Sequence, residues 1–388
     1  MNTIEKDQKY LIGTYARFPL EIVSGKGSVA YGADGKSYVD MGAGIAVNTF
    51  GYADDVFTSA VTAQLNKVQH TSNLYYTAPG ADLAEALCIK AGMKKAFLCN
   101  SGAEANECAI KAARKWGAEH KGAGAYKIVT LVSSFHGRTI TTLSATGQEV
   151  FHKHFDPFTE GFVYVPMGDE AALENAIDDK TAAVMVEFIQ GEGGVNVMPA
   201  SFAKKIFSLR EKFGFLVIAD EVQTGNGRTG KYFAYQAFGV QPDIVTTAKG
   251  LGGGLPIGAC LFGEKSENVL GKGDHGSTFG GNPAVAAGAL SIVNRLDDAL
   301  LAEVTEKGEY IKKKLTGKEG ILSVSGMGLM LGVSVAADAK KVVASCLEKG
   351  VLFLTAKDKV RLLPALNIPY DLIDKAIDVL LEAVKEAL

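Results

Sequence analysis

The sequence has few cysteines and no excess of charge of one sign. Its 388 residues include five cysteines, none of them in a CxxC pair, together with 40 basic and 43 acidic residues. The cysteines fit small buried residues of a reducing compartment better than a disulfide framework or a zinc site. Because nucleic acids and anionic membranes require a basic surface, we expect neither as a partner.

Long apolar segments are also missing. No run approaches the ~18 apolar residues of a membrane-spanning helix. The first residues, MNTIEKDQKY, are polar and partly acidic, unlike a secretory signal or an Arg-rich transit peptide. We therefore expect a cytoplasmic protein.

Short apolar runs alternate with helical patterns along most of the chain. Uninterrupted runs rich in Val, Ile and Phe are typical of strands buried on both faces, and their alternation with helices predicts a mainly parallel α/β sheet. The predicted strands are KAFLCN (95–100), KIVTLVS (127–133), TAAVMVEF (181–188), FLVIAD (215–220), DIVTTA (243–248) and GACLFG (258–263).

The pattern changes after Pro283, where longer amphipathic helices surround four short strands. We predict a large α/β/α domain over residues 50–282 and a smaller α+β domain over residues 283–388. Residues 1–49 contain a DG hairpin signal and are expected to pack on this core as part of the small domain.

Glycine is concentrated in two windows. Of 45 glycines, seven lie between residues 191 and 230 and eleven between 249 and 281. Glycine permits tight turns and close approach of the backbone to a ligand. These windows are where a site is expected.

The predicted strand at 95–100 runs directly into a helix that begins SGAEAN. Ser101 and Glu104 have capping-box spacing, and Gly102 would let a ligand approach the backbone. Such a helix N-terminus suits a phosphate group. The same residues also suit a plain helix start.

Asp220 ends one predicted strand, and Lys249 follows another. Ligands bind at the carboxyl ends of strands in an open α/β sheet, so these two side chains would share one crevice. A partly buried lysine attacks carbonyl carbons, and an aspartate holds a pyridine nitrogen protonated. Solvated turn residues are the alternative.

The segment FHGRT follows a third strand. Phe135 could stack on a flat ligand, and Arg138 could bind a carboxylate through two hydrogen bonds. Phe135 could equally belong to the core, and His136 could be a loop histidine. His152 and His154 lack a third ligand, so no metal site is predicted.

Taken together, the motifs resemble the class III, ornithine-type family of pyridoxal phosphate-dependent aminotransferases. The resemblance implies the fold type I architecture and covers nearly the whole chain. It is carried by GKGSVAYGADGKSYVD, GIAVNTFGY, SGAEAN, FHGRT, EFIQGEGG, DEVQTGNGRTG, PDIVTTAKGLGGGLPIGA, HGSTFGGNP and VRLLPALNI.

The resemblance implies pyridoxal 5′-phosphate as the cofactor. Lys249 would hold it through an imine and move the proton, and Asp220 would pair with its ring nitrogen. Thr278 would reach the phosphate in the neighbouring subunit of a homodimer with shared active sites. The other implied cofactor contacts are Gly102, Ala103, Phe135, Glu221, Val222 and Gln223.

For substrates, the resemblance implies two carboxylate-binding arginines. Arg138 would bind the α-carboxylate of an acylated diamino acid, and Arg361 that of glutamate. Glu192 would neutralise Arg361 when a terminal amine must be presented; a structural ion pair is the alternative. Ser277 and Tyr15 would be substrate neighbours.

The implied reaction moves the terminal amine of N2-acetyl-L-ornithine to 2-oxoglutarate in arginine biosynthesis. The same chemistry would also suit succinylornithine, succinyldiaminopimelate, ornithine or 4-aminobutyrate as donor. An aminomutase and a non-catalytic family member are the remaining alternatives.

Overall fold

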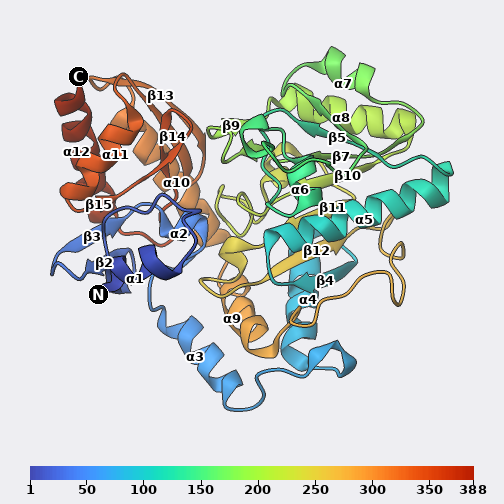
Figure 1. Cartoon of the computed structure of the whole chain (residues 1–388), viewed down its shortest axis with the longest axis horizontal. Coiled ribbons are helices and arrows are strands. Elements are labelled where there is room, and N and C mark those ends of the chain that lie inside the picture. Colours follow the sequence, from blue (N-terminus) through green and yellow to red (C-terminus); the bar gives the residue numbers. More distant parts are fainter.

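A seven-stranded sheet forms the centre of the larger lobe in the computed structural model, which describes all residues from 1 to 388 (Figure 1). Only β12 runs antiparallel to its neighbours. The mainly parallel α/β prediction is confirmed, and β6 is the strand that it omitted. The sheet order is β4 (Lys95–Cys99), β12 (Gly258–Phe262), β11 (Ile244–Thr247), β10 (Leu216–Asp220), β7 (Thr181–Val186), β5 (Lys127–Leu131) and β6 (Phe162–Val165).

Both faces of this sheet are buried. In β10, Ile218 belongs to the cluster around α5, whereas Val217 belongs to the larger cluster on the opposite face. Since successive strand side chains point to opposite faces, two helical layers produce the uninterrupted apolar runs. The helices of this lobe are α3 (Asp55–Leu65), α4 (Ala78–Ala91), α5 (Gly102–Lys121), α6 (Ile140–Ala145), α7 (Glu170–Ala176), α8 (Ala200–Phe213) and α9 (Pro283–Val293).

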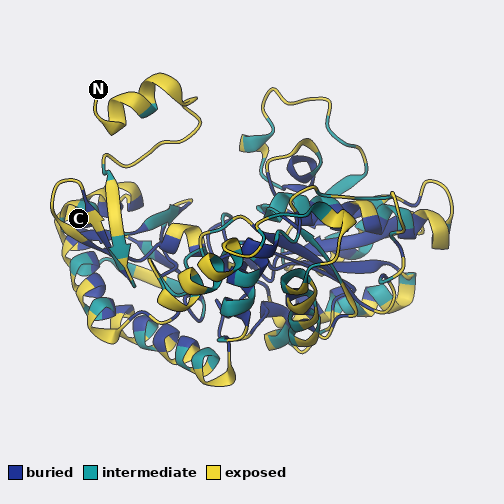
Figure 2. Ribbon diagram, turned by 90° about the horizontal axis from the view of Figure 1, so that it is seen from below, coloured by how far each residue is buried: buried dark blue, intermediate teal, exposed yellow.

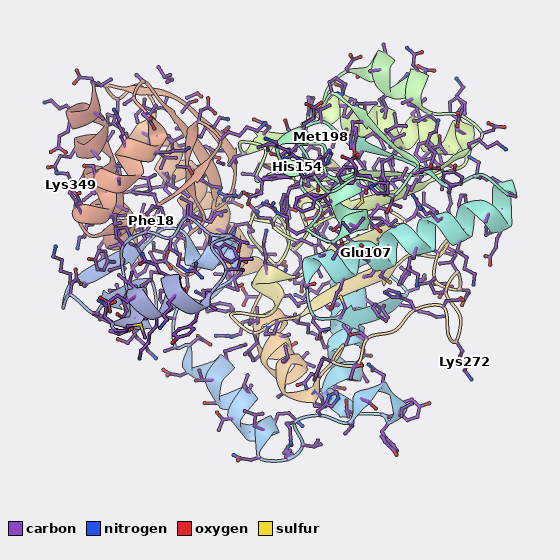
Figure 3. All side chains as sticks on the ribbon, viewed as in Figure 1. Phe18, Glu107, His154, Met198, Lys272 and Lys349 are labelled. Carbon is purple, nitrogen blue, oxygen red and sulfur yellow. The ribbon has the colours of Figure 1, made fainter.

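The smaller lobe contains an antiparallel sheet covered by three helices (Figure 1). Lys349, labelled in Figure 3, bonds Glu382 and Glu386 and so ties the end of α11 to α12. The sheet order is β13 (Ile321–Met327), β14 (Met330–Val335), β17 (Lys359–Leu362) and β16 (Leu354–Ala356), and the helices are α10 (Asp298–Leu315), α11 (Ala339–Glu348) and α12 (Tyr370–Ala387).

The N-terminal segment joins the smaller lobe. The DG turn lies between β2 (Val29–Gly32) and β3 (Ser37–Asp40), β1 (Ile22–Lys26) pairs with β2, and β3 pairs in parallel with β15 (Val351–Leu352). Helix α1 (Thr3–Tyr10) has no buried residue and stands away from the body (Figure 2).

The domain boundary at residue 282 stays a prediction. Helix α9, just beyond it, packs against α3 and α4 of the larger lobe.

No helix in the structure is both long enough and apolar enough to cross a membrane. The remaining short elements are α2 (Ala43–Ala46), β8 (Ile189–Gln190), β9 (Asn196–Val197), η1 (Ser72–Leu74), η2 (Glu149–Phe151), η3 (Ala234–Phe238) and η4 (Lys249–Leu251).

Candidate active site

A cavity of about 640 Å³ opens at the carboxyl ends of the central strands. The segments that follow β4, β5, β10 and β11 all line it, as expected for a mainly parallel sheet. The structure brings most of the sequence-predicted residues together here. Those that line the cavity are Tyr15, Gly102, Ala103, Phe135, Arg138, Asp220, Val222, Gln223 and Lys249.

Lys249 begins η4, separated from the end of β11 by a single residue, with a φ of 45°. Burial lowers the pKa of its amine, and the nearby Arg361 lowers it further, whereas Glu192 and Asp220 act in the opposite direction. The Thr49 hydroxyl donates to the carbonyl of Gly250 over 2.7 Å and braces this turn. A buried amine with a lowered pKa is more often neutral, as a nucleophile must be.

Asp220 ends β10 and is only 3% exposed. Its Oδ2 accepts a hydrogen bond from Nδ2 of Asn106 and lies 2.8 Å from Nδ1 of His136, and its Oδ1 accepts one from the backbone N–H of Val222. Thr246 donates to Oδ1 of Asn106 and fixes the amide orientation. The carboxylate is therefore held at the cavity wall in one orientation.

Sequence reasoning missed Asn106 and left His136 without a role. Asn106 lies four residues after Gly102, so both occupy the same face of α5. This four-residue spacing could have indicated that Asn106 faces the same cavity as Gly102. The pairing with Asp220 joins residues 114 positions apart, and only the folded chain shows it.

Glu187 is a second residue that the sequence did not reveal. It lines the cavity just after β7, and its Oε2 accepts a hydrogen bond from the backbone N–H of Phe135 over 2.9 Å. Burial raises the pKa of this carboxyl to about 7, and Asp220 adds to the effect while His136 opposes it. Glu187 thus fixes the backbone that carries the Phe135 ring.

A triangle of polar side chains adjoins Lys249. Nη1 of Arg361 donates to Oε1 of Glu192 over 2.7 Å and to Oε1 of Gln223 over 3.3 Å. Although burial alone would raise the pKa of Glu192, the Arg361 guanidinium holds it below its usual value. Glu192 lies in the turn between β8 and β9, and Arg361 in β17, so this contact joins the two lobes.

The N-terminus of α5 forms one end of the cavity. Oγ of Ser101 accepts from the backbone N–H of Glu104, as capping predicts, whereas the Glu104 carboxylate accepts from Asn100 rather than Ser101. A Cβ at Gly102 would lie 2.6 Å from a methyl carbon of Val222. Glycine therefore lets the first turn of the helix pack closely against the segment after β10.

Four of the predicted site residues are not enclosed in the wall of this cavity. Tyr15 lines the cavity but is 73% exposed, and Thr278 is exposed and does not line it. Ser277 also lies outside the lining and accepts from Nδ2 of Asn100 over 3.0 Å. Glu221 does not line the cavity either, because its carboxylate is buried and accepts hydrogen bonds from Thr224 and from the backbone N–H groups of residues 234 and 235.

The residues of this cavity fit pyridoxal 5′-phosphate. A partly buried lysine, a fixed carboxylate and an aromatic ring line the same cavity, and free N–H groups at the start of a 20-residue helix offer an anion site. Three or more His, Cys, Asp or Glu side chains are nowhere grouped as metal ligands.

Comparison with known proteins gives one consistent family. The family model described as "Aminotransferase class-III" matches residues 13–384. An acetylornithine aminotransferase of Haemophilus ducreyi is 47% identical, with 98% of each chain covered, and one of Aquifex aeolicus is 44% identical, covering 96% of this chain and 99% of its own.

Solved structures give the same result. The ornithine aminotransferase of Toxoplasma gondii superposes with a TM-score of 0.94 at 32% identity, covering 99% of this chain and 94% of its own. The N-acetylornithine aminotransferase of Stenotrophomonas maltophilia superposes with a TM-score of 0.85 at 34% identity, covering 99% and 98%.

Proposed function

Because the chain belongs to the class III aminotransferases and is a pyridoxal phosphate-dependent transaminase, we propose that its amino donor is N2-acetyl-L-ornithine. The terminal amine passes to 2-oxoglutarate, giving N-acetylglutamate 5-semialdehyde and glutamate, a reaction of arginine biosynthesis. The carrying observation is the pair of arginines, since Arg361 is neutralised by Glu192 whereas Arg138 pairs with no acidic residue. One free arginine suits a donor with one carboxylate.

The cofactor, when bound, supplies an electron sink that lets a proton leave the carbon bearing the amine. In this proposal the Asp220 carboxylate holds the pyridine nitrogen protonated, and Asn106 and His136 keep that carboxylate in place. The N–H groups of Gly102 and Ala103 bind the phosphate. Nζ of Lys249 would take the proton from the amine-bearing carbon of the donor and deliver it to the cofactor carbon that bears the imine.

The substrate carboxylates are divided between the two arginines. Arg138 binds the α-carboxylate of the donor, which places the terminal amine toward Lys249. Glutamate and 2-oxoglutarate bring a second carboxylate, which takes the place of Glu192 on Arg361. Arg361 is buried but Glu192 is partly exposed, so the guanidinium can exchange one acidic partner for another without being left unpaired. Tyr15, which lines the cavity, and Ser277, which contacts the lining residue Asn100, would border the substrate.

The proposal includes a cytoplasmic homodimer with shared active sites. Thr278 lies on the loop between β12 and α9 and would contact the phosphate of the neighbouring subunit. Apolar side chains at this surface support an interface, since Tyr75 is 72% and Phe279 is 61% exposed. Nδ2 of Asn73 donates to the carbonyls of Ser277 and Gly280 and holds the two loops together.

Ornithine is the second candidate donor, because the chain superposes on ornithine aminotransferase with a TM-score of 0.94. Turnover with acetylornithine, succinylornithine, succinyldiaminopimelate, ornithine and 4-aminobutyrate would decide between the donors. We expect acetylornithine to give the highest kcat/KM and one glutamate per 2-oxoglutarate consumed. Better use of any other donor contradicts the assignment.

The role of Lys249 has a test of its own. Borohydride reduction of the holoenzyme followed by peptide mapping should place the pyridoxyl group on Lys249. A label on another lysine, or none, contradicts the mechanism. Glutamate formation without an amine donor in the mixture would expose a contaminating activity.

A further inference from the structure

The Arg138 guanidinium lies over the ring of Phe151 and near the ring of Phe135. Its central carbon lies 3.9 Å from the ring centroid of Phe151 and 5.4 Å from that of Phe135. Arg138 is exposed and has neither a salt bridge nor a side-chain hydrogen bond with another residue of the chain. Its contacts differ in kind from those of Arg361, which is 3% exposed and bonded to Glu192 and Gln223.

Stacking occupies the flat face of a guanidinium and leaves its edge free. Five N–H donors lie in the plane of the group, and a carboxylate binds them edge-on. A ring below that plane attracts the cation through its quadrupole and limits its rotation. Phe151 therefore restrains Arg138 without using any donor that a substrate carboxylate needs.

The loop that carries Phe151 is itself anchored. The backbone N–H of Gly147 donates to Oγ of Ser134 and the Gln148 amide donates to the carbonyl of Ser134, both over 3.0 Å. The Phe151 ring meets the Phe135 ring edge-on at 5.9 Å. These contacts attach the Phe151 loop to the segment that holds Phe135 and Arg138.

The next residue holds the other side of the loop. The His152 ring lies 4.9 Å from the Phe158 ring, and Nε2 of His152 lies 3.0 Å from the carbonyl oxygen of Leu143. The loop continues through His154, labelled in Figure 3. Phe151 is thus a fixed platform rather than the tip of a free loop.

We propose that Phe151 is a positioning residue that orients Arg138 for the donor carboxylate and so favours carboxylate-bearing amines over simple amines. The inference rests on the proposed function, because it takes the carboxylate of the donor as the ligand of Arg138. Phe151 acts through Arg138, and it takes part in no proton transfer.

The test compares two donors that differ only in the carboxylate, acetylornithine and its decarboxylated counterpart N-acetylputrescine. For F151A we expect the KM for acetylornithine to rise about 3- to 30-fold, the range that a cation–π contact supplies. For N-acetylputrescine, single-turnover measurements of the cofactor absorbance give a rate constant and a Kd. The ratio of rate constant to Kd in F151A should stay within about 2-fold of wild type, because that amine makes no contact with Arg138.

Binding gives a second readout that is independent of turnover. N-acetyl-L-norvaline has the carboxylate of acetylornithine and lacks the reactive amine. Calorimetric titration of the holoenzyme should show the same fold-loss of affinity in F151A, a smaller loss in F151L, and near wild-type affinity in F151Y, which keeps the aromatic face. F151L retains bulk and serves if F151A folds poorly.

Phe155 provides the matched control, because it lies on the same loop, is 54% exposed and has no aromatic or cation contact. F155A should leave both donors unchanged. Equal losses for the two donors in F151A, no loss at all, or the same effect in F155A would overturn the inference. If the wild-type enzyme does not turn over acetylornithine, the proposed donor is wrong, and this inference is not thereby contradicted. Phe151 is then tested with the carboxylate-bearing donor that gives the highest kcat/KM among the five donors named above.

Discussion

Glu192 and Arg361 form a 2.7 Å ion pair close to the amine of Lys249, although 169 residues separate the two in the sequence. The Glu192 side chain is 28% exposed and the Arg361 side chain 4%. The acidic partner is therefore the one that a substrate can reach and replace. This arrangement gives a direct prediction about substrate preference.

Substitution E192Q should shift that preference toward glutamate. Without the negative charge, Arg361 is free for a second carboxylate, so the kcat/KM ratio of glutamate to acetylornithine should rise by about 10-fold, which corresponds to about 1.4 kcal/mol. Single-turnover absorbance changes of the cofactor measure each half-reaction separately. An unchanged ratio, with both substrates equally impaired, would mean that the pair is only structural.

Substitution G102A should weaken cofactor binding, because its Cβ would lie 2.6 Å from Cγ1 of Val222. We expect the Kd for pyridoxal phosphate, measured by fluorescence titration of the apoenzyme, to rise at least ~10-fold, or about 1.4 kcal/mol. The double variant G102A/V222A removes the clashing methyl groups and should recover part of the loss. G276A is the control, since a Cβ there meets nothing within 4 Å. No rescue by V222A would contradict the packing argument.

Glu221 should make stability fall as pH rises through the range from about 5 to 7. Burial raises the pKa of this carboxyl from 4.5 to about 7, against the hydrogen bonds that it accepts. The native state then binds more protons than the unfolded state between these values, and deprotonation above pH 7 removes the advantage.

Urea unfolding of wild type and E221Q at pH 5 and pH 8 tests this linkage. The decrease in unfolding free energy between the two pH values should be smaller in E221Q by about 2 kcal/mol. Only the difference between the pH values is diagnostic, because the glutamine also alters hydrogen bonds at both. Parallel decreases in the two proteins would contradict the prediction.

Arg228 should stabilise the junction of the two lobes. Its fully buried guanidinium donates to the carbonyls of Leu329 and Pro364 and has no acidic partner. R228M leaves both carbonyls without a donor, so the free energy of unfolding should fall by about 3 kcal/mol. R17A breaks an exposed ion pair with Asp7 and should cost less than about 1 kcal/mol. Equal costs for the two variants would exclude this role.

Several features of the site could be predicted from the sequence because they depend on neighbouring residues. The apolar runs located six of the seven strands of the central sheet, all but β6, and Asp220 and Lys249 are among the residues at their carboxyl ends. In a mainly parallel sheet these ends meet at one edge. The local apolar pattern and the parallel direction of the strands were therefore sufficient to predict that both side chains lie at one cavity.

Glu221 shows that adjacency in the sequence does not predict where a side chain points. It follows Asp220 directly, yet one carboxylate reaches the cavity wall and the other enters the core. Hydrogen bonds to the backbone of residues 234 and 235 hold Glu221 there, and those residues become its neighbours only after folding.

The sequence by itself determined the alternation of strands and helices, the strand-end residues and the family motifs, because these are properties of short segments. Only the tertiary structure decided which side chains surround each of them: Asn106 and His136 at Asp220, Glu187 at Phe135, and Phe151 beneath Arg138. Three of these four contacts join different strand–helix units, and their geometry follows from how the layers pack.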